Sequence, residues 1–230
     1  MRALENLNRY FKWLGVEGCL GKNRIGRLLV VSRANTFVAI PKDRIGALIG
    51  SDGRVKEELE KKLNVELSID SQIGDVTITL SPDAQDPSLL FRAKEVVTAI
   101  GSGFSPDRSF RLIRDEDAVF EVIDLRQILG RSLPELERVK GRIIGQGGKT
   151  RRTIEELTEA DVSVQKHTVS LIANVDQMDV AKEAIQMLLQ GSQHSKVYRF
   201  LQRKRSEIKK KKLEFELWEK RAPEEDAILK

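Results

Sequence analysis

Residues Ile45–Gly53 are IGALIGSDG and residues Lys140–Gly148 are KGRIIGQGG, so the chain holds two copies of one pattern 95 positions apart. Each copy places aliphatic residues before a Gly-x-x-Gly step and a charged, helix-forming segment after it. Glycine reaches backbone conformations that are closed to other residues, so it permits a sharp turn between two helices. The start of the second helix presents unpaired N–H groups and a positive dipole end, which favour phosphate. The pattern therefore predicts a helix-turn-helix corner that can hold a phosphate backbone.

This corner resembles the loop of KH modules, which clamps about four nucleotides of a single strand by their backbone. A corner with two incidental glycines is the alternative for one such loop, but two copies in matching contexts disfavour it. In a KH module the bases lie across an aliphatic groove. Ile143, Ile144 and Val164 are the candidates for its floor, and core packing is the alternative role for at least one of them.

The repeat extends beyond the loops, because alternating apolar strands follow each of them. Three strands and a closing helix are expected in each copy: Thr36–Ile40, Val65–Ile69, Val76–Leu80 and Ala93–Val97 in the first, and Ala118–Leu125, Val162–Val164, Val169–Ala173 and Ala181–Ile185 in the second. Each copy thus has the order β-α-α-β-β-α. The predicted fold class is α+β, with two tandem type I KH domains, each a three-stranded sheet with helices on one face, plus terminal extensions.

The domain boundaries follow from the repeat. We expect an N-terminal extension over 1–34, KH domain 1 over 35–104, KH domain 2 over 105–192 and a basic helical tail over 193–230. The extension contains the aromatic residues Tyr10, Phe11 and Trp13, which form either a docking surface or a flap on the core.

Composition limits the classes of protein. A single cysteine excludes an internal disulfide and a cysteine-rich metal site. No apolar run approaches the length of a membrane span, and no signal-peptide pattern opens the chain, so a cytoplasmic protein without a membrane partner is expected. Residues 1–34 and 193–230 each carry a net charge of +5, which leaves −5 for 35–192. Affinity for RNA must therefore come from local basic patches.

The two loops differ in charge. The second is surrounded by Lys140, Arg142, Lys149, Arg151 and Arg152, with no acid from 139 to 154. Around the first, four cations are interrupted by two acids: Lys42, Arg44, Arg54 and Lys56 by Asp43 and Asp52. We therefore expect the second module to be the stronger clamp; ordinary solvated surface charge is the alternative for each cluster.

Catalytic and metal-binding patterns were not found. Gly148-Lys149-Thr150 resembles the end of a phosphate-binding Walker loop, but the spacing would require a glycine at Ile143. The two histidines, His167 and His194, have no ligand set for zinc nearby. The prediction is a protein that is not an enzyme, with no cofactor, no metal and no small-molecule substrate.

The segment Gly101-Ser102-Gly103-Phe104-Ser105-Pro106 joins the two copies. Glycine after a helix and Ser-Pro before the next are ordinary stop and start signals, and a helix over Asp107–Ile113 is expected. The segment is either a linker or a second turn that binds the RNA backbone. In the tail, the run Lys209–Lys212 is either a solvated helical face or a phosphate contact.

The order of these motifs resembles a known family. Gly-Ser-Gly-Phe-Ser-Pro (101–106) is followed by Phe-Glu-Val-Ile-Asp-Leu (120–125), the second loop and Ser-Lys-Val-Tyr (195–198). This combination is similar to the archaeal double-KH ribosome-assembly proteins, counterparts of the eukaryotic Dim-two or "partner of Nob-one" proteins. The resemblance implies binding of single-stranded RNA near the 3′ end of the small-subunit rRNA precursor. It implies a Nob-one-type endonuclease as a partner, and the α subunit of translation initiation factor two as a further one.

The resemblance also implies that the second loop makes the main RNA contact and that the turn at 101–103 adds another. The eukaryotic relatives have lost the first Gly-x-x-Gly, which remains here. The predicted RNA-binding residues are Gly145, Gln146, Gly147, Gly148, Lys149, Thr150, Lys140, Arg142, Arg151, Arg152, Ile143, Ile144, Val164, Gly50, Ser51, Gly53, Arg54, Lys56, Gly101, Ser102 and Gly103.

The predicted function is that of a non-catalytic rRNA-binding assembly factor that positions the maturation endonuclease. Two alternatives stay open: a KH-type regulator of mRNA or small RNA, and a protein-interaction adaptor whose KH folds are vestigial. The intact glycines and the acid-free second loop argue against the adaptor.

Overall fold

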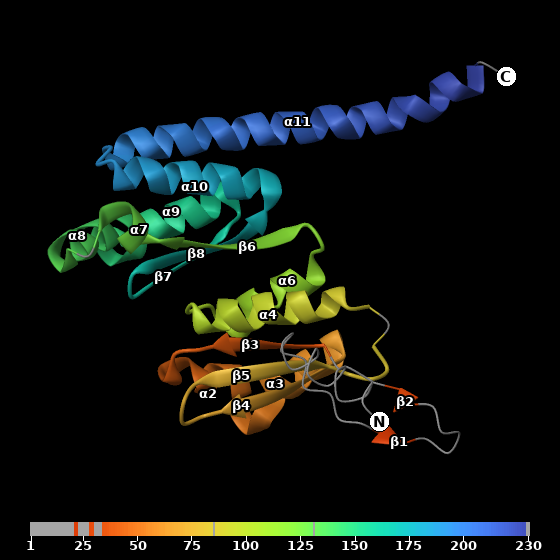
Figure 1. The fold of residues 1–230 in the computed structure, drawn as a ribbon. Coiled ribbons are helices and arrows are strands. Elements are labelled where there is room, and N and C mark those ends of the chain that lie inside the picture. Colours follow the sequence, from red (N-terminus) through yellow and green to blue (C-terminus); the bar gives the residue numbers. More distant parts are fainter. Residues whose placement is uncertain (1–20, 23–27, 30–33, 85, 131, 229–230) are drawn as a thin grey trace, which may run out of the picture. The chain divides into compact units, whose positions relative to one another are not determined.

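A computed structural model describes residues 21–22, 28–29, 34–84, 86–130 and 132–228 (Figure 1). The chain divides into two compact units, Met1–Val97 and Thr98–Lys230. Most of the N-terminal extension, including its three aromatic residues, lies outside the described residues; within it, β1 (Gly21–Lys22) pairs antiparallel with β2 (Leu28–Leu29).

The first unit has the β-α-α-β-β-α order that the sequence predicts. Its elements are β3 (Asn35–Ala39), α2 (Lys42–Ile49), the 3-10 turn η1 (Ser51–Gly53), α3 (Arg54–Leu63), β4 (Val65–Asp70), β5 (Asp75–Leu80) and most of α4 (Ser88–Gly101), whose last four residues fall in the second unit. Antiparallel pairing places β5 between the other two strands, in the order β3-β5-β4. Val76 and Ile78 are fully buried and alternate with Thr77, so one face of the sheet packs on the helices.

The second unit repeats this order and adds helices to it. It comprises α5 (Pro106–Ser109), α6 (Arg111–Arg114), β6 (Ala118–Asp124), α7 (Leu125–Leu129), α8 (Leu133–Ile144), the 3-10 turn η2 (Gln146–Gly148), α9 (Lys149–Thr158), β7 (Asp161–Gln165), β8 (Thr168–Asn174), α10 (Val175–Leu189) and α11 (His194–Ile228). The sheet order is β6-β8-β7 and all pairings are antiparallel. In Figure 1, α9, α10 and α11 lie on one side of this sheet.

Two expected boundaries in this unit are wrong. Leu125 begins α7 instead of ending a strand, because the Asp124 carboxylate accepts a hydrogen bond from the Arg126 N–H at 2.8 Å and caps the helix. The helix expected over Asp107–Ile113 is two short helices, α5 and α6, joined at the buried residue Phe110.

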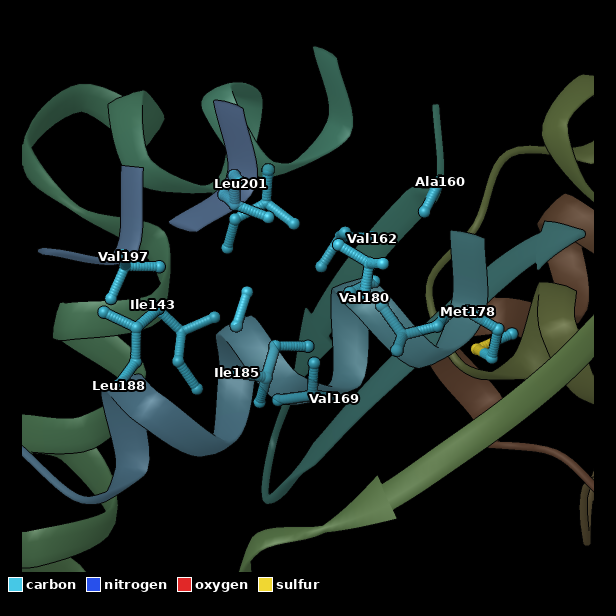
Figure 2. Packing of buried hydrophobic residues seen from close by; sticks show 14 of the residues in the cluster. Ile143, Ala160, Val162, Val169, Met178, Val180, Ile185, Leu188, Val197 and Leu201 are labelled. Carbon is cyan, nitrogen blue, oxygen red and sulfur yellow. The ribbon is translucent and has the colours of Figure 1, made fainter. Parts of the chain in front are cut away.

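The core of the second unit lies between the sheet and its helical layer (Figure 2). Val162 and Val169 extend from the strands, Ile143 from α8, and Ile185 and Leu188 from α10; the start of α11 adds Val197 and Leu201. Ile143 is fully buried on the face of α8 that packs on the core, which favours the core-packing alternative for this residue.

The opposite face of this sheet is covered by the segment that precedes β6, which the expected one-sided layer did not include. Phe104 meets Phe120 of β6 edge-to-face, with ring centroids 6.5 Å apart, and Phe110 and Leu112 are buried. Among the described helices, none combines the length and the apolarity that crossing a membrane requires.

Candidate nucleic-acid interface

The two Gly-x-x-Gly turns have the same backbone conformation. The first glycine has φ 74° and ψ −179° at Gly50, and φ 73° and ψ 172° at Gly145. The third position has φ 55° and ψ 26° at Asp52, and φ 57° and ψ 23° at Gly147. The fourth is left-handed in both turns. The repeat seen in the sequence therefore extends to the torsion angles of the loop.

The first glycine of each turn has no room for a side chain. A Cβ at Gly145 would lie 2.8 Å from the Thr150 N and closer still to the Thr150 Oγ1. A Cβ at Gly50 would lie 3.1 Å from the Val55 N and closer to a methyl of Val55. The residue five positions after the glycine therefore packs directly beneath the turn.

The middle of the second turn is open. Gln146 and Gly147 are exposed, and a Cβ at Gly147 would meet nothing within 4 Å. Lys149, at the start of α9, is exposed, and no ion pair or hydrogen bond of its ammonium group is found within the part of the chain that the structure describes. A phosphate at this turn would find an approachable main chain, the start of a ten-residue helix and one uncommitted cation.

The other four cations of the second loop are engaged within the protein. Lys140 pairs with Glu137 at 2.8 Å, and Arg151 pairs with Glu155 at 3.8 Å. Arg152 donates hydrogen bonds to the Gly147 carbonyl and, at 3.4 Å, to the Gly148 carbonyl. Arg152 therefore stabilises the conformation of the turn.

Arg142 is committed to the fold. Its guanidinium donates to the Ser192 carbonyl at 2.6 Å and to the Leu188 carbonyl at 3.4 Å. These carbonyls lie at the end of α10 and in the corner before α11, so the guanidinium ties α8 to this corner. Its expected role as a phosphate contact does not fit this geometry.

Thr150 is likewise a structural residue. Its side chain is 2% exposed, and its Oγ1 shares a hydrogen bond with the Tyr198 hydroxyl at 3.1 Å. The hydroxyl lies beneath the turn, so this geometry favours a structural role for the side chain over a direct contact with RNA. The sequence showed no partner for it, since Tyr198 lies 48 positions away.

Ile144 and Val164, the other two candidates for the floor of the groove, are both half-buried, and Val164 also packs against the core. Val164 lies on β7, an edge strand of its sheet.

The β7 residue Val162 donates its N–H to the Glu155 carboxylate at 3.1 Å, and Leu67 in the first unit donates to Glu60 at 2.7 Å. These two glutamates are again 95 positions apart. The sequence did not indicate that they bond to strand N–H groups, because a charged residue on a helix is ordinarily solvated.

The turn at Gly101, Ser102 and Gly103 packs against β7. The Ser102 carbonyl accepts a hydrogen bond from the Ser163 hydroxyl at 2.8 Å. Gly103 has φ 100°, and a Cβ there would lie 2.7 Å from the Ser163 Oγ. The structure thus brings this turn to the strand that carries Val164.

The first turn carries a different charge pattern. Ser51, Asp52 and Arg54 are exposed, and Lys56 is paired with Glu60 at 3.8 Å. The exposed carboxylate of Asp52 occupies the position that Gly147 leaves open in the second turn.

Comparison with known proteins agrees with this geometry. Residues 119–206 match the family of the second KH domain of PNO1, described as a eukaryotic-type KH domain of type I. The chain is 45% identical over 186 residues to the KH domain-containing protein MJ0443 of Methanocaldococcus jannaschii, covering 81% of this chain and 80% of that protein. It is 26% identical over 161 residues to the pre-rRNA-processing protein pno1 of Schizosaccharomyces pombe, covering 70% of this chain and 67% of that protein.

Among solved structures, a complex of a/eIF2α, aDim2p and rRNA from Pyrococcus horikoshii contains a similar chain. The TM-score is 0.72 at 44% identity, over 77% of this chain and 97% of that one. The family match, the archaeal relative and this solved structure all indicate the same family. The chain therefore belongs to the PNO1/Dim2 family of KH-domain proteins.

Proposed function

We propose that this protein binds single-stranded RNA through two tandem type I KH domains and acts as a small-subunit ribosome assembly factor. The observation that carries the proposal is the second turn, where an exposed Gly-x-x-Gly backbone lies beside the uncommitted cation Lys149. The names of the relatives support it, since the Schizosaccharomyces pombe protein is a pre-rRNA-processing protein and the Pyrococcus horikoshii complex contains rRNA.

The two domains would span 35–104 and 105–192, flanked by an extension over 1–34 and a tail over 193–230. Because both units have the same element order and the same turn conformation, we assign a KH domain to each of them. The last residues of domain 1, from 98 to 104, lie within the second compact unit and bond to Ser163, so they would contribute to the RNA-binding surface of domain 2.

In the proposed mechanism, the second turn holds about four nucleotides by their phosphates. Gly145 to Gly148 and Lys149 contact the backbone, while Ile144 and Val164 support the bases. Arg152 and Thr150 act indirectly by holding the turn in shape, while Arg142 holds the α10–α11 corner. The turn at 101–103 adds a backbone contact beside β7, and the first loop contributes less because of Asp52.

The RNA would be the 3′ region of the small-subunit rRNA precursor, and the endonuclease that matures this end would be positioned by the protein. The α subunit of translation initiation factor two would be a further partner, as in the Pyrococcus horikoshii complex. Cleavage of a precursor by the purified endonuclease, with and without this protein, tests the positioning role. Unchanged site choice and rate would count against it.

Direct binding to a short single-stranded RNA with the 3′-end sequence, beside a scrambled RNA of equal length, tests the RNA-binding function. We expect tighter binding to the 3′-end sequence at two salt concentrations, because base edges supply selectivity that phosphate contacts do not. Equal affinity for both RNAs would make the protein a general single-strand binder, and no binding at either salt would reject the proposal.

Lys149→Ala should weaken binding to both RNAs by a similar factor. It should also lower the slope of log affinity against log salt by about 0.7, the value for one phosphate contact to a single strand. Arg142→Ala is the matched control, because its guanidinium holds the α10–α11 corner, and it should mainly lower the unfolding temperature. A larger slope change for Arg142→Ala than for Lys149→Ala would reverse these assignments.

Asp52→Asn should raise RNA affinity about threefold to tenfold at low salt if the first loop takes part in binding. The change keeps side-chain size and removes one carboxylate from beside a phosphate, a repulsion that salt screens. The gain should therefore shrink at high salt. No gain in an RNA long enough to reach both loops would show that the first loop does not contact it.

A further inference from the structure

The corner between α10 and α11 is joined to both helices that flank the second turn. On the α8 side, Arg142 donates to the Leu188 and Ser192 carbonyls, and the Arg142 carbonyl lies 3.0 Å from the His194 Nε2. On the α9 side, the Tyr198 hydroxyl lies 3.1 Å from the Thr150 Oγ1. The start of α11 therefore contacts both helices that flank the second Gly-x-x-Gly turn.

Thr150 transmits this contact to the turn. Its hydroxyl occupies the space next to the Cα of Gly145, where even one added methyl group would collide with it. Because Thr150 is buried, the hydroxyl depends on a partner within the protein, and Tyr198 supplies it. The hydrogen bond thus holds the Thr150 side chain in the orientation that fits beneath Gly145.

The first turn has no such link. Its counterpart of Thr150 is Val55, whose methyl group fills the same space beneath Gly50. A valine side chain cannot hydrogen-bond, so the first turn has an apolar support and the second a polar one tied to α11. The two turns have the same torsion angles but are supported differently.

We propose that Tyr198 is a positioning residue for the RNA-binding loop of the second unit, acting through Thr150. The proposal rests on the proposed function, since it concerns how that loop holds RNA. A loop that is already in its bound conformation loses less conformational freedom on binding and so binds more tightly. Tyr198 itself does not touch the RNA.

Tyr198→Phe should lower RNA affinity about twofold to tenfold, the range that corresponds to one net hydrogen bond. Thr150→Val, which installs the residue of the first turn, should have a similar effect. The double variant should bind RNA no more weakly than the single variant with the lower affinity, because both changes break the same Thr150–Tyr198 hydrogen bond. Ser195→Ala is the control: it removes an exposed hydroxyl one turn away and should leave affinity unchanged.

A purely structural role would lower the unfolding temperature without changing the affinity of the folded protein, and that result would overturn the proposal. Additive losses in the double variant would overturn it as well. If the wild-type protein bound no RNA while folded, the proposed function itself would fail, and this inference with it.

Amide hydrogen exchange in the free protein gives a readout that does not require RNA. The Gly145 N–H is bonded to the Gly141 carbonyl at 2.8 Å and the Gly148 N–H to the Gly145 carbonyl at 3.1 Å. Both amides should exchange faster in Tyr198→Phe than in the wild type, while the Gly50 amide, bonded to the Gly46 carbonyl, should not change. If the Gly145 and Gly148 amides exchanged at the same rates in Tyr198→Phe as in the wild type, the proposal would be contradicted even if RNA binding had changed.

Discussion

Replacing Gln146 and Gly147 together with aspartate should lower the affinity for single-stranded RNA by about a hundredfold or more. Both positions are exposed at the top of the second turn, where the proposed phosphates lie. Two like charges about 4 Å apart repel each other by about 1 to 4 kcal/mol near a protein surface. Two such repulsions sum to about 2 to 8 kcal/mol, and a hundredfold loss in affinity corresponds to about 3 kcal/mol, in the lower part of this range.

The fold should tolerate this double substitution. Gly147 has a positive φ of 57°, which most side chains avoid, but Asp52 adopts φ 55° at the matching position of the first turn. A Cβ at Gly147 meets nothing within 4 Å, and Gln146 is solvated. The first loop is therefore an internal precedent for aspartate in this conformation, and the unfolding temperature should change by only a few degrees.

The matched control replaces the same two residues with asparagine, which has the shape of aspartate without the charge. Binding should be lost with the aspartates and largely kept with the asparagines, measured by titration of labelled RNA at two salt concentrations. Equal loss in both variants would mean that shape, not charge, matters at this turn. Full affinity in the aspartate variant, with normal unfolding, would exclude the turn as the phosphate site.

The order of helices and strands could be predicted from the sequence because each copy of the repeat shows patterns that involve only neighbouring residues. Strand alternation and two turns with glycines at fixed offsets depend on near neighbours, and the structure has the predicted order of elements in both units. The short helix α7 was missed because Asp124 caps it through a single hydrogen bond inside a segment of apolar residues. The hydrogen bond from the Arg126 N–H to Asp124 ends the strand and begins the helix at this point.

The roles of individual site residues could not be predicted in the same way. Five cations around the second turn look alike in the sequence, and only their contacts in the structure separate Lys149 from Arg142, which has long-range partners, and from Arg152, which bonds back to the turn. Thr150 follows a Gly-Gly-Lys sequence that suggests a phosphate contact, yet its partner is Tyr198 on α11. Partners that are about 50 positions apart leave no periodic signal.

Gly145→Ala should destabilise the second unit by about 3 kcal/mol, and the neighbouring Gly147→Ala by about 1 kcal/mol. Both substitutions put a side chain on a residue with positive φ, 73° and 57° respectively. Only Gly145 adds a collision, since its Cβ would lie 2.8 Å from the backbone nitrogen of Thr150, in a helix that cannot move aside without disturbing the core. The difference in unfolding free energy between the two variants therefore measures the cost of the collision with Thr150, apart from the cost of the positive φ.

Urea unfolding followed by circular dichroism measures this difference as a shift in the transition midpoint. Gly50→Ala in the first unit should fall between the two, because its Cβ would mainly meet a methyl group of Val55, with the backbone nitrogen of that residue at 3.1 Å. The expected order of destabilisation is Gly145, then Gly50, then Gly147. An equal cost at Gly145 and Gly147 would mean that Thr150 and α9 can shift to accept the methyl group. The turn would then be held less firmly from below than its contacts indicate.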